Sequence, residues 1–311
     1  MSQITASAVN ELRQKTGAGM MDCKKALTET AGDLEKAIDV LRKKGLSAAA
    51  KKAGRVAAEG QVTALVQGNV GVVLELNCET DFVGMGPEFK AIADAVATQV
   101  ATKNPADIDA LQTTTTANGK DVKTVITEAV AKIGENIQVR RFNRFETAGG
   151  LLGSYIHAGG KIGVLLELGS DNAAALQKPE ATQLAKDLCL HVAANKPLYL
   201  IPSEIAPDVL AREREIARDQ AKASGKPEAF LDKIIDGKLA KFAQEICLLE
   251  QGFVKDPDTT VKKLLDAESK KLGGKLSVVR FARFELGEGI EKKKDDFAAE
   301  VAAASGVGAK H

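Results

Sequence analysis

The side chains that could form a catalytic or metal site are few in this sequence. Its three histidines are His157, His191 and the terminal His311, so a histidine-based triad or metal site would depend on the first two. Cys189 and His191 could supply two ligands, but residues two positions apart on a helix point in different directions. A buried thiol beside a histidine on the helix surface is the favoured interpretation. The sequence also contains no glycine-rich phosphate loop and no nucleophile elbow. We therefore expect a protein that is not an enzyme and has neither a cofactor nor a metal.

A second set of candidate residues lies where an apolar strand is expected to end. Residues 77–84 read Asn-Cys-Glu-Thr-Asp-Phe-Val-Gly and place a large aromatic side chain beside a carboxylate. Connections on a rigid scaffold commonly carry binding residues, so Phe82 and Asp81 could contact a partner. Taken alone, the local sequence favours another interpretation, in which Phe82 folds back into the core and Asp81 caps the following helix.

A third motif pairs arginines with phenylalanines. Residues 139–146 read Val-Arg-Arg-Phe-Asn-Arg-Phe-Glu, and residues 278–285 read Val-Val-Arg-Phe-Ala-Arg-Phe-Glu. Adjacent basic and aromatic residues are used by proteins that bind single-stranded RNA, so an RNA- or ribosome-associated protein is the alternative function. However, alternation along a strand puts Arg141 and Phe142 on opposite faces, and the strand lacks the glycine of an RNA-recognition strand. Core phenylalanines with solvent-facing arginines are therefore favoured.

The composition sets limits on the class of protein. The chain has 311 residues, of which 44% are apolar and 27% are charged, so it can form a real core and about two domains. Its formal net charge of +1 is far from the basic balance that direct nucleic-acid binding usually requires. The four cysteines stand far apart and are expected to be reduced, buried thiols. We found neither a targeting segment nor a membrane-spanning run, which predicts a cytoplasmic protein that does not bind membranes.

Apolar residues at helical spacing mark three short helices in the first ~45 residues. Gly32 and Gly45 stand where helix C-caps are expected. The Ala- and Lys-rich stretch 48–58 has little to bury and is expected to be a linker. The glycines of the loop 16–19 allow a sharp turn between the first two helices. This pattern resembles the compact fold of ubiquitin-associated domains.

The rest of the chain repeats itself. Residues 71–76 read Gly-Val-Val-Leu-Glu-Leu and return at 163–168 as Gly-Val-Leu-Leu-Glu-Leu, 92 residues later. Each copy precedes an amphipathic helix that ends at a proline, Pro105 or Pro197, which are again 92 residues apart. The arginine–phenylalanine motif recurs after 139 residues, so the second copy contains 47 additional residues. These offsets predict a duplicated α+β core.

The additional residues have a pattern of their own. Helices are expected over 208–223 and 231–246, separated by the breaker Ser-Gly-Lys-Pro at 224–227. Because only one narrow seam is apolar, we expect an antiparallel coiled-coil hairpin that projects from the body. The C-terminal tail is expected to form a final helix, with Phe297 and Val301 one turn apart, that docks on another surface.

The segment Thr80-Asp81-Phe82-Val83 resembles the signature of the elongation factor Ts family, the guanine-nucleotide exchange factors for elongation factor Tu. Residues 16–27, Thr-Gly-Ala-Gly-Met-Met-Asp-Cys-Lys-Lys-Ala-Leu, are similar to the first motif of that family. Further similar segments follow in the family's order at 133–136, 153–157, 224–227 and 287–292. The resemblance covers essentially the whole chain, and Gly84 stands where the family frequently has alanine.

The resemblance implies an α+β fold with antiparallel sheets and four parts. These are a three-helix ubiquitin-associated-like domain with its linker (1–54), a first core subdomain (55–148), a second core subdomain (149–286) that contains the coiled-coil insertion at about 203–252, and a C-terminal helical module (287–311).

The resemblance also implies the function and the contact residues. The protein would bind elongation factor Tu, both GDP-bound and nucleotide-free, and promote the release of GDP and Mg²⁺. The principal contacts fall on Thr80, Asp81, Phe82 and Val83. The other partner contacts fall on Arg13, Met20, Met21, Lys24 and His157. From the residues alone, core positions are favoured for the methionines and solvated helix charges for the two cations, while the histidine could equally be an ordinary strand residue.

Overall fold

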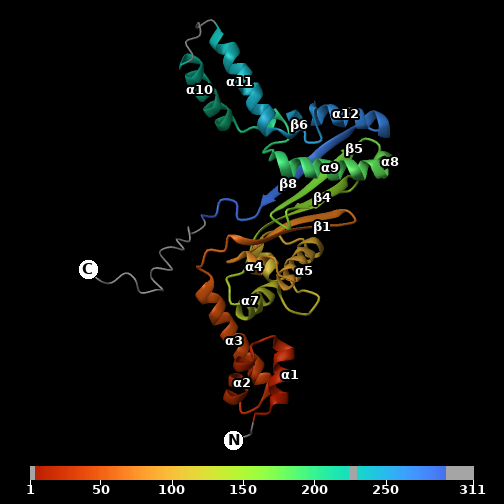
Figure 1. Cartoon of the computed structure of the whole chain (residues 1–311). Coiled ribbons are helices and arrows are strands. Elements are labelled where there is room, and N and C mark those ends of the chain that lie inside the picture. Colours follow the sequence, from red (N-terminus) through yellow and green to blue (C-terminus); the bar gives the residue numbers. More distant parts are fainter. Residues whose placement is uncertain (1–3, 224–229, 292–311) are drawn as a thin grey trace, which may run out of the picture.

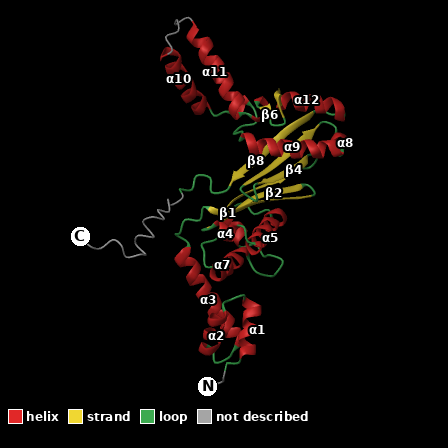
Figure 2. Ribbon diagram, in the orientation of Figure 1, coloured by secondary structure: helices red, strands yellow, loops and turns green. Residues whose placement is uncertain are grey.

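The computed structural model describes residues 4–223 and 230–291 and has an elongated shape (Figures 1 and 2). The predicted breaker at 224–227 and the predicted C-terminal helix with Phe297 and Val301 lie outside these residues. Within the described part of the chain, no helix is both long enough and apolar enough to cross a membrane.

Three helices form the N-terminal end: α1 (Ala6–Thr16), α2 (Met20–Glu29) and α3 (Leu34–Lys52). They enclose a small core that contains the fully buried side chains of Leu12, Cys23 and Leu27. The helix α1 ends at Gly17, whose φ of 67° is in the left-handed region that favours glycine.

The predicted end of α3 at Gly45 is wrong, as is the linker that was expected to begin at residue 48. The helix continues to Lys52 and packs against α7 (Val122–Ile133) of the next part of the chain. A Cβ atom at Gly45 would lie 3.4 Å from that of Ala131, so this position faces α7 closely. Gly45 is therefore an interior helix residue at the packing surface with α7 rather than a helix end.

Two three-stranded antiparallel sheets form the centre of the molecule. The first contains β1 (Glu59–Gln67), β2 (Val70–Cys78) and β3 (Gln138–Glu146) in the order β1-β2-β3. The second contains β4 (Leu151–His157), β5 (Ile162–Ser170) and β8 (Leu276–Glu285) in the order β4-β5-β8. The structure is therefore of mixed helix and sheet type with antiparallel sheets, as predicted.

Helices cover the outer faces of both sheets (Figure 1). The first sheet carries α5 (Pro87–Lys103), α6 (Ile108–Gln112) and α7 on its outer side. The second carries α8 (Ala173–Leu176), α9 (Pro179–Asn195) and α12 (Val261–Leu272). The helices α5 and α9 begin 92 residues apart, and α7 and α12 begin 139 residues apart. Both offsets equal those found in the sequence.

The inner faces of the two sheets pack against each other. Their shared core includes Val62, Val73 and Leu165. Gly71 and Gly163, which are equivalent in the two repeats, let the sheets approach: a Cβ atom at Gly71 would lie 2.6 Å from the Leu165 side chain, and one at Gly163 would lie 2.4 Å from that of Val62. The repeated glycine is therefore a packing residue.

The arginines of the repeated motif were predicted simply to face solvent, but Arg141 and Arg280 are only partly exposed and each is paired with a carboxylate. Arg141 donates from Nε to Glu75 Oε2 at 2.6 Å, and the equivalent Arg280 donates to Glu167 Oε2 at 2.7 Å. Each guanidinium also lies over a phenylalanine of the opposite sheet. Arg141 is 4.4 Å from the centroid of the Phe284 ring, and Arg280 is 4.3 Å from that of Phe145. The motif therefore joins the two sheets, which sequence alternation alone could not indicate.

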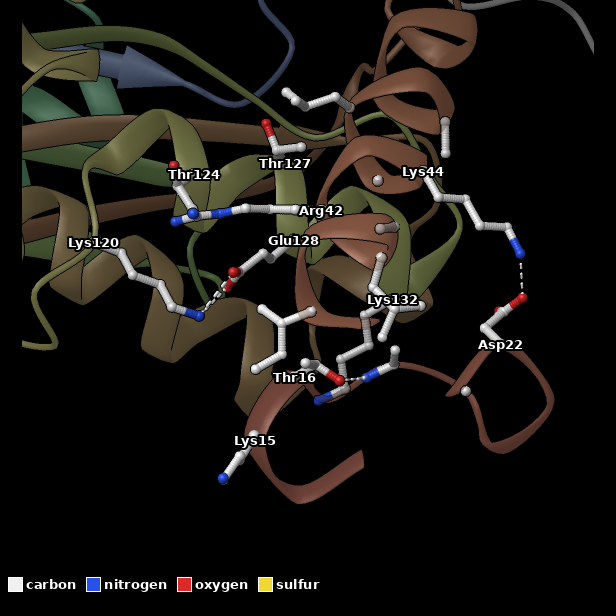
Figure 3. A pocket seen from close by; sticks show the side chains of 18 of the residues that line it. Lys15, Thr16, Asp22, Arg42, Lys44, Lys120, Thr124, Thr127, Glu128 and Lys132 are labelled. Carbon is white, nitrogen blue, oxygen red and sulfur yellow. Dashed lines mark hydrogen bonds and ion pairs between the residues drawn. The ribbon is translucent and has the colours of Figure 1, made fainter. Parts of the chain in front are cut away.

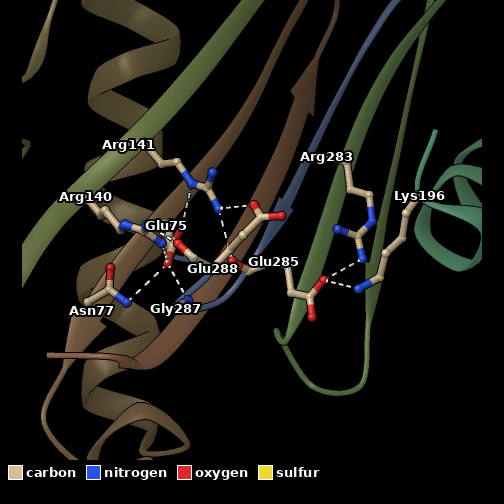
Figure 4. A network of polar contacts seen from close by, with 9 residues as sticks. All are labelled: Glu75, Asn77, Arg140, Arg141, Lys196, Arg283, Glu285, Gly287 and Glu288. Carbon is tan, nitrogen blue, oxygen red and sulfur yellow. Dashed lines mark hydrogen bonds and ion pairs between the residues drawn. The ribbon is translucent and has the colours of Figure 1, made fainter. Parts of the chain in front are cut away.

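The buried carboxylate of Glu75 gathers several of these contacts (Figure 4). It accepts hydrogen bonds from Asn77 Nδ2 at 3.2 Å and from Arg140 Nη1 at 3.0 Å. It also accepts one from the backbone N–H of Gly287 at 2.8 Å. The segment that follows β8 is thereby tied to the first sheet, 212 residues away in sequence.

The insertion in the second repeat forms two antiparallel helices, α10 (Pro207–Ala223) and α11 (Leu231–Ile246), that project from the body (Figure 1). Its ends, in contrast, lie on the body of the second repeat. They carry η1 (Pro202–Glu204), η3 (Leu248–Glu250) and β6 (Gly252–Phe253), and β7 (Asp256–Thr260) follows. Leu248 and Phe253 are buried in the core of the second repeat. The projecting part is thus shorter than the predicted insertion at 203–252.

His191 is fully buried, whereas a position on the helix surface was predicted. The Val254 N–H donates to its Nδ1 at 3.1 Å, so Nε2 carries the proton and donates to Gln251 Oε1 at 3.0 Å. Burial lowers the pKa of His191, and the hydrogen bond with Gln251 opposes this effect only in part. Neutral His191 therefore fastens the base of the hairpin to α9.

Candidate protein-binding site

The Thr80–Val83 segment is a single helical turn on the surface. Thr80 is the N-cap residue of α4 (Asp81–Gly84), which lies between β2 and α5. Phe82 is 83% exposed, so the interpretation of this ring as a core residue is wrong. Val83 is half-buried and packs on the core of the first repeat. Asp81 is exposed and is the first residue of α4 rather than its cap.

Glu135 anchors the start of α4. Its Oε2 accepts hydrogen bonds from the backbone N–H groups of Glu79 and Thr80, both at 3.1 Å. Its Oε1 accepts one from Thr80 Oγ1 at 2.6 Å. Glu135 itself follows Gly134, the C-cap of α7, whose φ is 89°. One carboxylate thus joins the end of α7 to the turn that presents Phe82.

The chain segments around this anchor are also fastened to each other. Glu79 Oε1 accepts a hydrogen bond from the backbone N–H of Asn136 at 2.6 Å, and Asn136 Nδ2 donates to the Arg55 carbonyl at 2.8 Å. Cys78 Sγ donates to the Thr80 carbonyl at 3.1 Å. Burial raises the pKa of Cys78 to about 12, and the nearby charge of Glu135 acts in the same direction. This thiol is therefore a structural donor and not a nucleophile.

The C-terminal end of α4 packs on β1 without a side chain between them. A Cβ atom at Gly84 would lie 2.8 Å from both the Cα and the carbonyl oxygen of Gly60. Gly60 itself has a φ of 127°. An alanine at position 84 would therefore require the backbone of β1 or α4 to move. Gly84, which stands where the family frequently has alanine, thus allows close contact between α4 and the backbone of β1.

His157 flanks the same end of β1. It is exposed at the end of β4, where its Nδ1 lies 3.0 Å from the Tyr155 hydroxyl. The turn that follows is fixed to β1, because the Val62 N–H donates to the Gly160 carbonyl at 2.8 Å. The beginning of β1 thus contacts both α4, through Gly60, and the turn after His157. The structure brings these two predicted contact regions onto one part of the molecule.

The four predicted contacts of the N-terminal helices lie elsewhere. Arg13, Met20, Met21 and Lys24 are all exposed on α1 and α2, at the end of the molecule away from the projecting hairpin (Figure 1). Met20 is 53% exposed and Met21 is 63% exposed, so neither serves the small core between the helices. An apolar pair left open to solvent is the type of surface that binds a protein partner.

Several residues of this region were not identified as site residues from the sequence. Met85 is 69% exposed and follows Phe82 by three positions, so it enlarges the apolar surface beside the ring. Glu135 was noticed only as part of a family-like segment, with no role attached. Its contact with Thr80 spans 55 residues, and no local pattern indicates such a pairing.

The most exposed apolar feature of this site is the Phe82 ring. In the residues that the structure describes, no group of three or more His, Cys, Asp or Glu side chains is arranged to hold a metal ion. A large aromatic side chain on an anchored turn is instead typical of a binding anchor, because little entropy is lost when it docks.

Comparison with known proteins gives the family. The model of the family described as elongation factor TS matches residues 79–288. Elongation factor Ts of Trichlorobacter lovleyi is 52% identical over 308 residues, which cover 98% of this chain and 99% of that protein. The protein of the same name from Clostridium perfringens is 51% identical over 305 residues, which cover 97% and 99%. That of Symbiobacterium thermophilum is 50% identical over 310 residues, which cover 99% and 100%. The chain therefore belongs to the elongation factor Ts family, the nucleotide exchange factors of translation elongation.

Proposed function

We propose that this chain binds elongation factor Tu in its GDP-bound and nucleotide-free forms and promotes the release of GDP and Mg²⁺ from it. Membership of the elongation factor Ts family supports this partner and this role. The observation that carries the assignment of the site is Phe82, an 83% exposed ring on a turn that Glu135 holds in place. We place this action in the cytoplasm, without a reaction catalysed by the chain itself.

Exchange follows from preferential binding. A factor that binds the nucleotide-free partner more tightly than the GDP-bound partner must weaken GDP binding by the same ratio. A ten-thousand-fold weakening requires about 5.5 kcal/mol of differential binding. A single aromatic anchor contributes about 2 kcal/mol or more. Several contact regions are therefore needed.

We infer a division of roles among these regions. Phe82 inserts into the nucleotide-binding domain of the partner, and Asp81 displaces the elements that hold its Mg²⁺. Thr80 and Val83 hold the turn, since one bonds to Glu135 and the other packs on the core. His157 adds a contact beside the turn. The distant residues Arg13, Met20, Met21 and Lys24 supply the additional binding energy.

Direct binding to RNA is not favoured as an alternative. Arg141 and Arg280, which suggested it, are ion-paired with Glu75 and Glu167, so a phosphate would have to compete with these carboxylates. The experiment that tests the proposed function is the release of labelled GDP from purified elongation factor Tu. Substoichiometric amounts of this protein should accelerate release through many turnovers. An unchanged rate would refute the proposal.

A further inference from the structure

A cleft of about 380 Å³ lies between the N-terminal helices and α7 (Figure 3). Its walls come from the α1–α2 loop, from α3 and from α7 with the loop before it. It is separate from the surface around Phe82, none of whose residues lines it. The size is within the range of pockets that bind small molecules.

Positive charge is concentrated in this cleft. Six cationic side chains line it, against the carboxylates of Asp22 and Glu128. Four of the cations are ion-paired: Lys44 with Asp22, Lys120 with Glu128, Lys15 with Glu11 and Lys132 with Glu88. The remaining two, Arg42 and Lys123, form no hydrogen bond or ion pair with any residue that the structure describes. A chain with a net charge of only +1 thus places six cations around one cleft, and two of them have no hydrogen-bonded or ion-paired partner among the described residues.

These two cations act at the same end of the cleft. Lys123 is on the first turn of α7, and in Figure 3 the Arg42 side chain points from α3 toward that turn. Hydrogen bonds from Thr124 lower the pKa of Asp121, the N-cap of α7, and the charges of Arg42 and Lys123 lower it further. Thr124 also lines the cleft and could donate its hydroxyl to a ligand.

The remainder of the cleft is largely apolar. Ile38, Leu41 and Ala131 contribute to its walls, and Leu46 is 51% exposed beside them. A ligand that satisfies the whole cleft therefore has a compact anionic group at one end and a flat or apolar body at the other. Arg42 and Lys123 have no ion-paired partner among the described residues, although the nearby Asp121 carboxylate offsets part of their charge. Two such cations match a phosphate monoester, which carries about −1.5 to −2 charges at pH 7, better than a carboxylate with a single charge.

We propose that this cleft is a binding site for a small organic phosphate monoester. Arg42 and Lys123 contact the phosphate, and the apolar walls cover the organic body. Such a ligand would bridge the N-terminal helices and α7. The proposal does not depend on the exchange activity.

The test uses the full chain and 4-methylumbelliferyl phosphate as the probe, with binding measured by titration calorimetry at low ionic strength. Umbelliferone without the phosphate and inorganic phosphate alone are the two comparison ligands. Saturable binding of the ester is expected, at least about tenfold tighter than either comparison ligand, because each provides only half of the contacts. Absence of saturable binding, or an affinity no greater than that of inorganic phosphate, would overturn the proposal.

Two variants locate the site. The double substitution Arg42→Gln and Lys123→Gln should weaken binding of the ester at least about tenfold, since it removes both charge-assisted contacts. Lys43→Gln is the matched control on the same helix, because Lys43 is exposed and does not line the cleft. It should change binding less than about twofold. In the wild-type chain the ester should also shift the NMR amide signals of Gly45 and Thr127. Equal weakening in both variants, or signal shifts confined to other regions, would overturn the proposal.

Discussion

Replacement of Glu135 by alanine is predicted to slow nucleotide exchange. The effect does not require Glu135 itself to contact the partner. The Glu135 carboxylate accepts three hydrogen bonds from Glu79 and Thr80, immediately before the turn that carries Phe82. The Ala variant loses all three. In the variant, Val83 and Gly84 still pack as before, but no side chain accepts hydrogen bonds from Glu79 and Thr80 at the start of α4.

The size of the effect follows from these bonds. Hydrogen bonds to a charged group contribute about 1.5–3 kcal/mol each when buried. Thr80 is exposed and Glu135 is half-buried, so in the variant water forms hydrogen bonds in place of many of those that Glu135 accepted. We expect the anchored form of α4 to lose about 1–2 kcal/mol relative to unanchored forms. This corresponds to a reduction in the rate of GDP release of about 5- to 30-fold when anchoring limits binding.

The assay is stopped-flow release of a fluorescent GDP analogue from elongation factor Tu, combined with a double-mutant cycle. If Glu135 acts by positioning Phe82, its substitution should have almost no further effect in a Phe82→Ala background. The matched control is Glu88→Ala. That glutamate is 48% exposed and pairs only at the surface with Lys132, so its loss should leave exchange nearly unchanged. A Glu135→Ala effect of the same size in both backgrounds would refute the positioning role, as would wild-type exchange by the single variant.

Three further predictions concern stability and the remaining contacts. Replacement of residues 209–244 by a short turn should leave the core folded, because the buried Leu248 and Gln251 lie outside the deletion. Urea unfolding should then show a cooperative transition, and a non-cooperative transition would contradict this prediction. Gly84→Val should lower the free energy of unfolding by about 1–3 kcal/mol, since its Cβ would meet the backbone of Gly60 at 2.8 Å; unchanged urea unfolding would contradict it. Because burial lowers the pKa of His191, the unfolded chain binds a proton at this site more readily than the folded chain. The stability that neutral, buried His191 contributes is therefore present above pH ~6.5 and is lost as the pH falls toward its pKa in the folded chain. Urea unfolding between pH 7.5 and 5 should show this loss, and His191→Gln should reduce it; the same pH dependence in both proteins would contradict the assignment.

The sequence predicted those parts of the structure that depend on local pattern or on repetition. The two helices of the projecting hairpin follow apolar spacing. The offsets of 92 and 139 residues recur in α5 and α9 and in α7 and α12. These features need only neighbouring residues or a comparison of the chain with itself. The positions chosen for the four parts of the chain, such as the limits at 55 and 149, stay predictions.

What the sequence did not reveal depends on contacts between distant segments. Gly45 was interpreted as a helix end, because nothing local indicates that α7 packs against it. Arg141 was placed in solvent, because its partners Glu75 and Phe284 lie on other strands. The same reason explains the buried His191, whose polar partners are 60 residues or more away. In each case a long-range pairing decided the environment of the side chain.

The central claim is that Phe82, presented on α4, drives nucleotide exchange, and the Phe82→Ala variant tests it most directly. With the ring 83% exposed, truncation should cost the free chain no more than about 1 kcal/mol, whereas a core phenylalanine costs about 3–5 kcal/mol. The loss should appear instead in the complex, where about 2 kcal/mol corresponds to a roughly thirtyfold change. We predict that release of labelled GDP from elongation factor Tu becomes at least about tenfold slower while urea unfolding is nearly unchanged. Release at the wild-type rate per folded molecule would contradict the account.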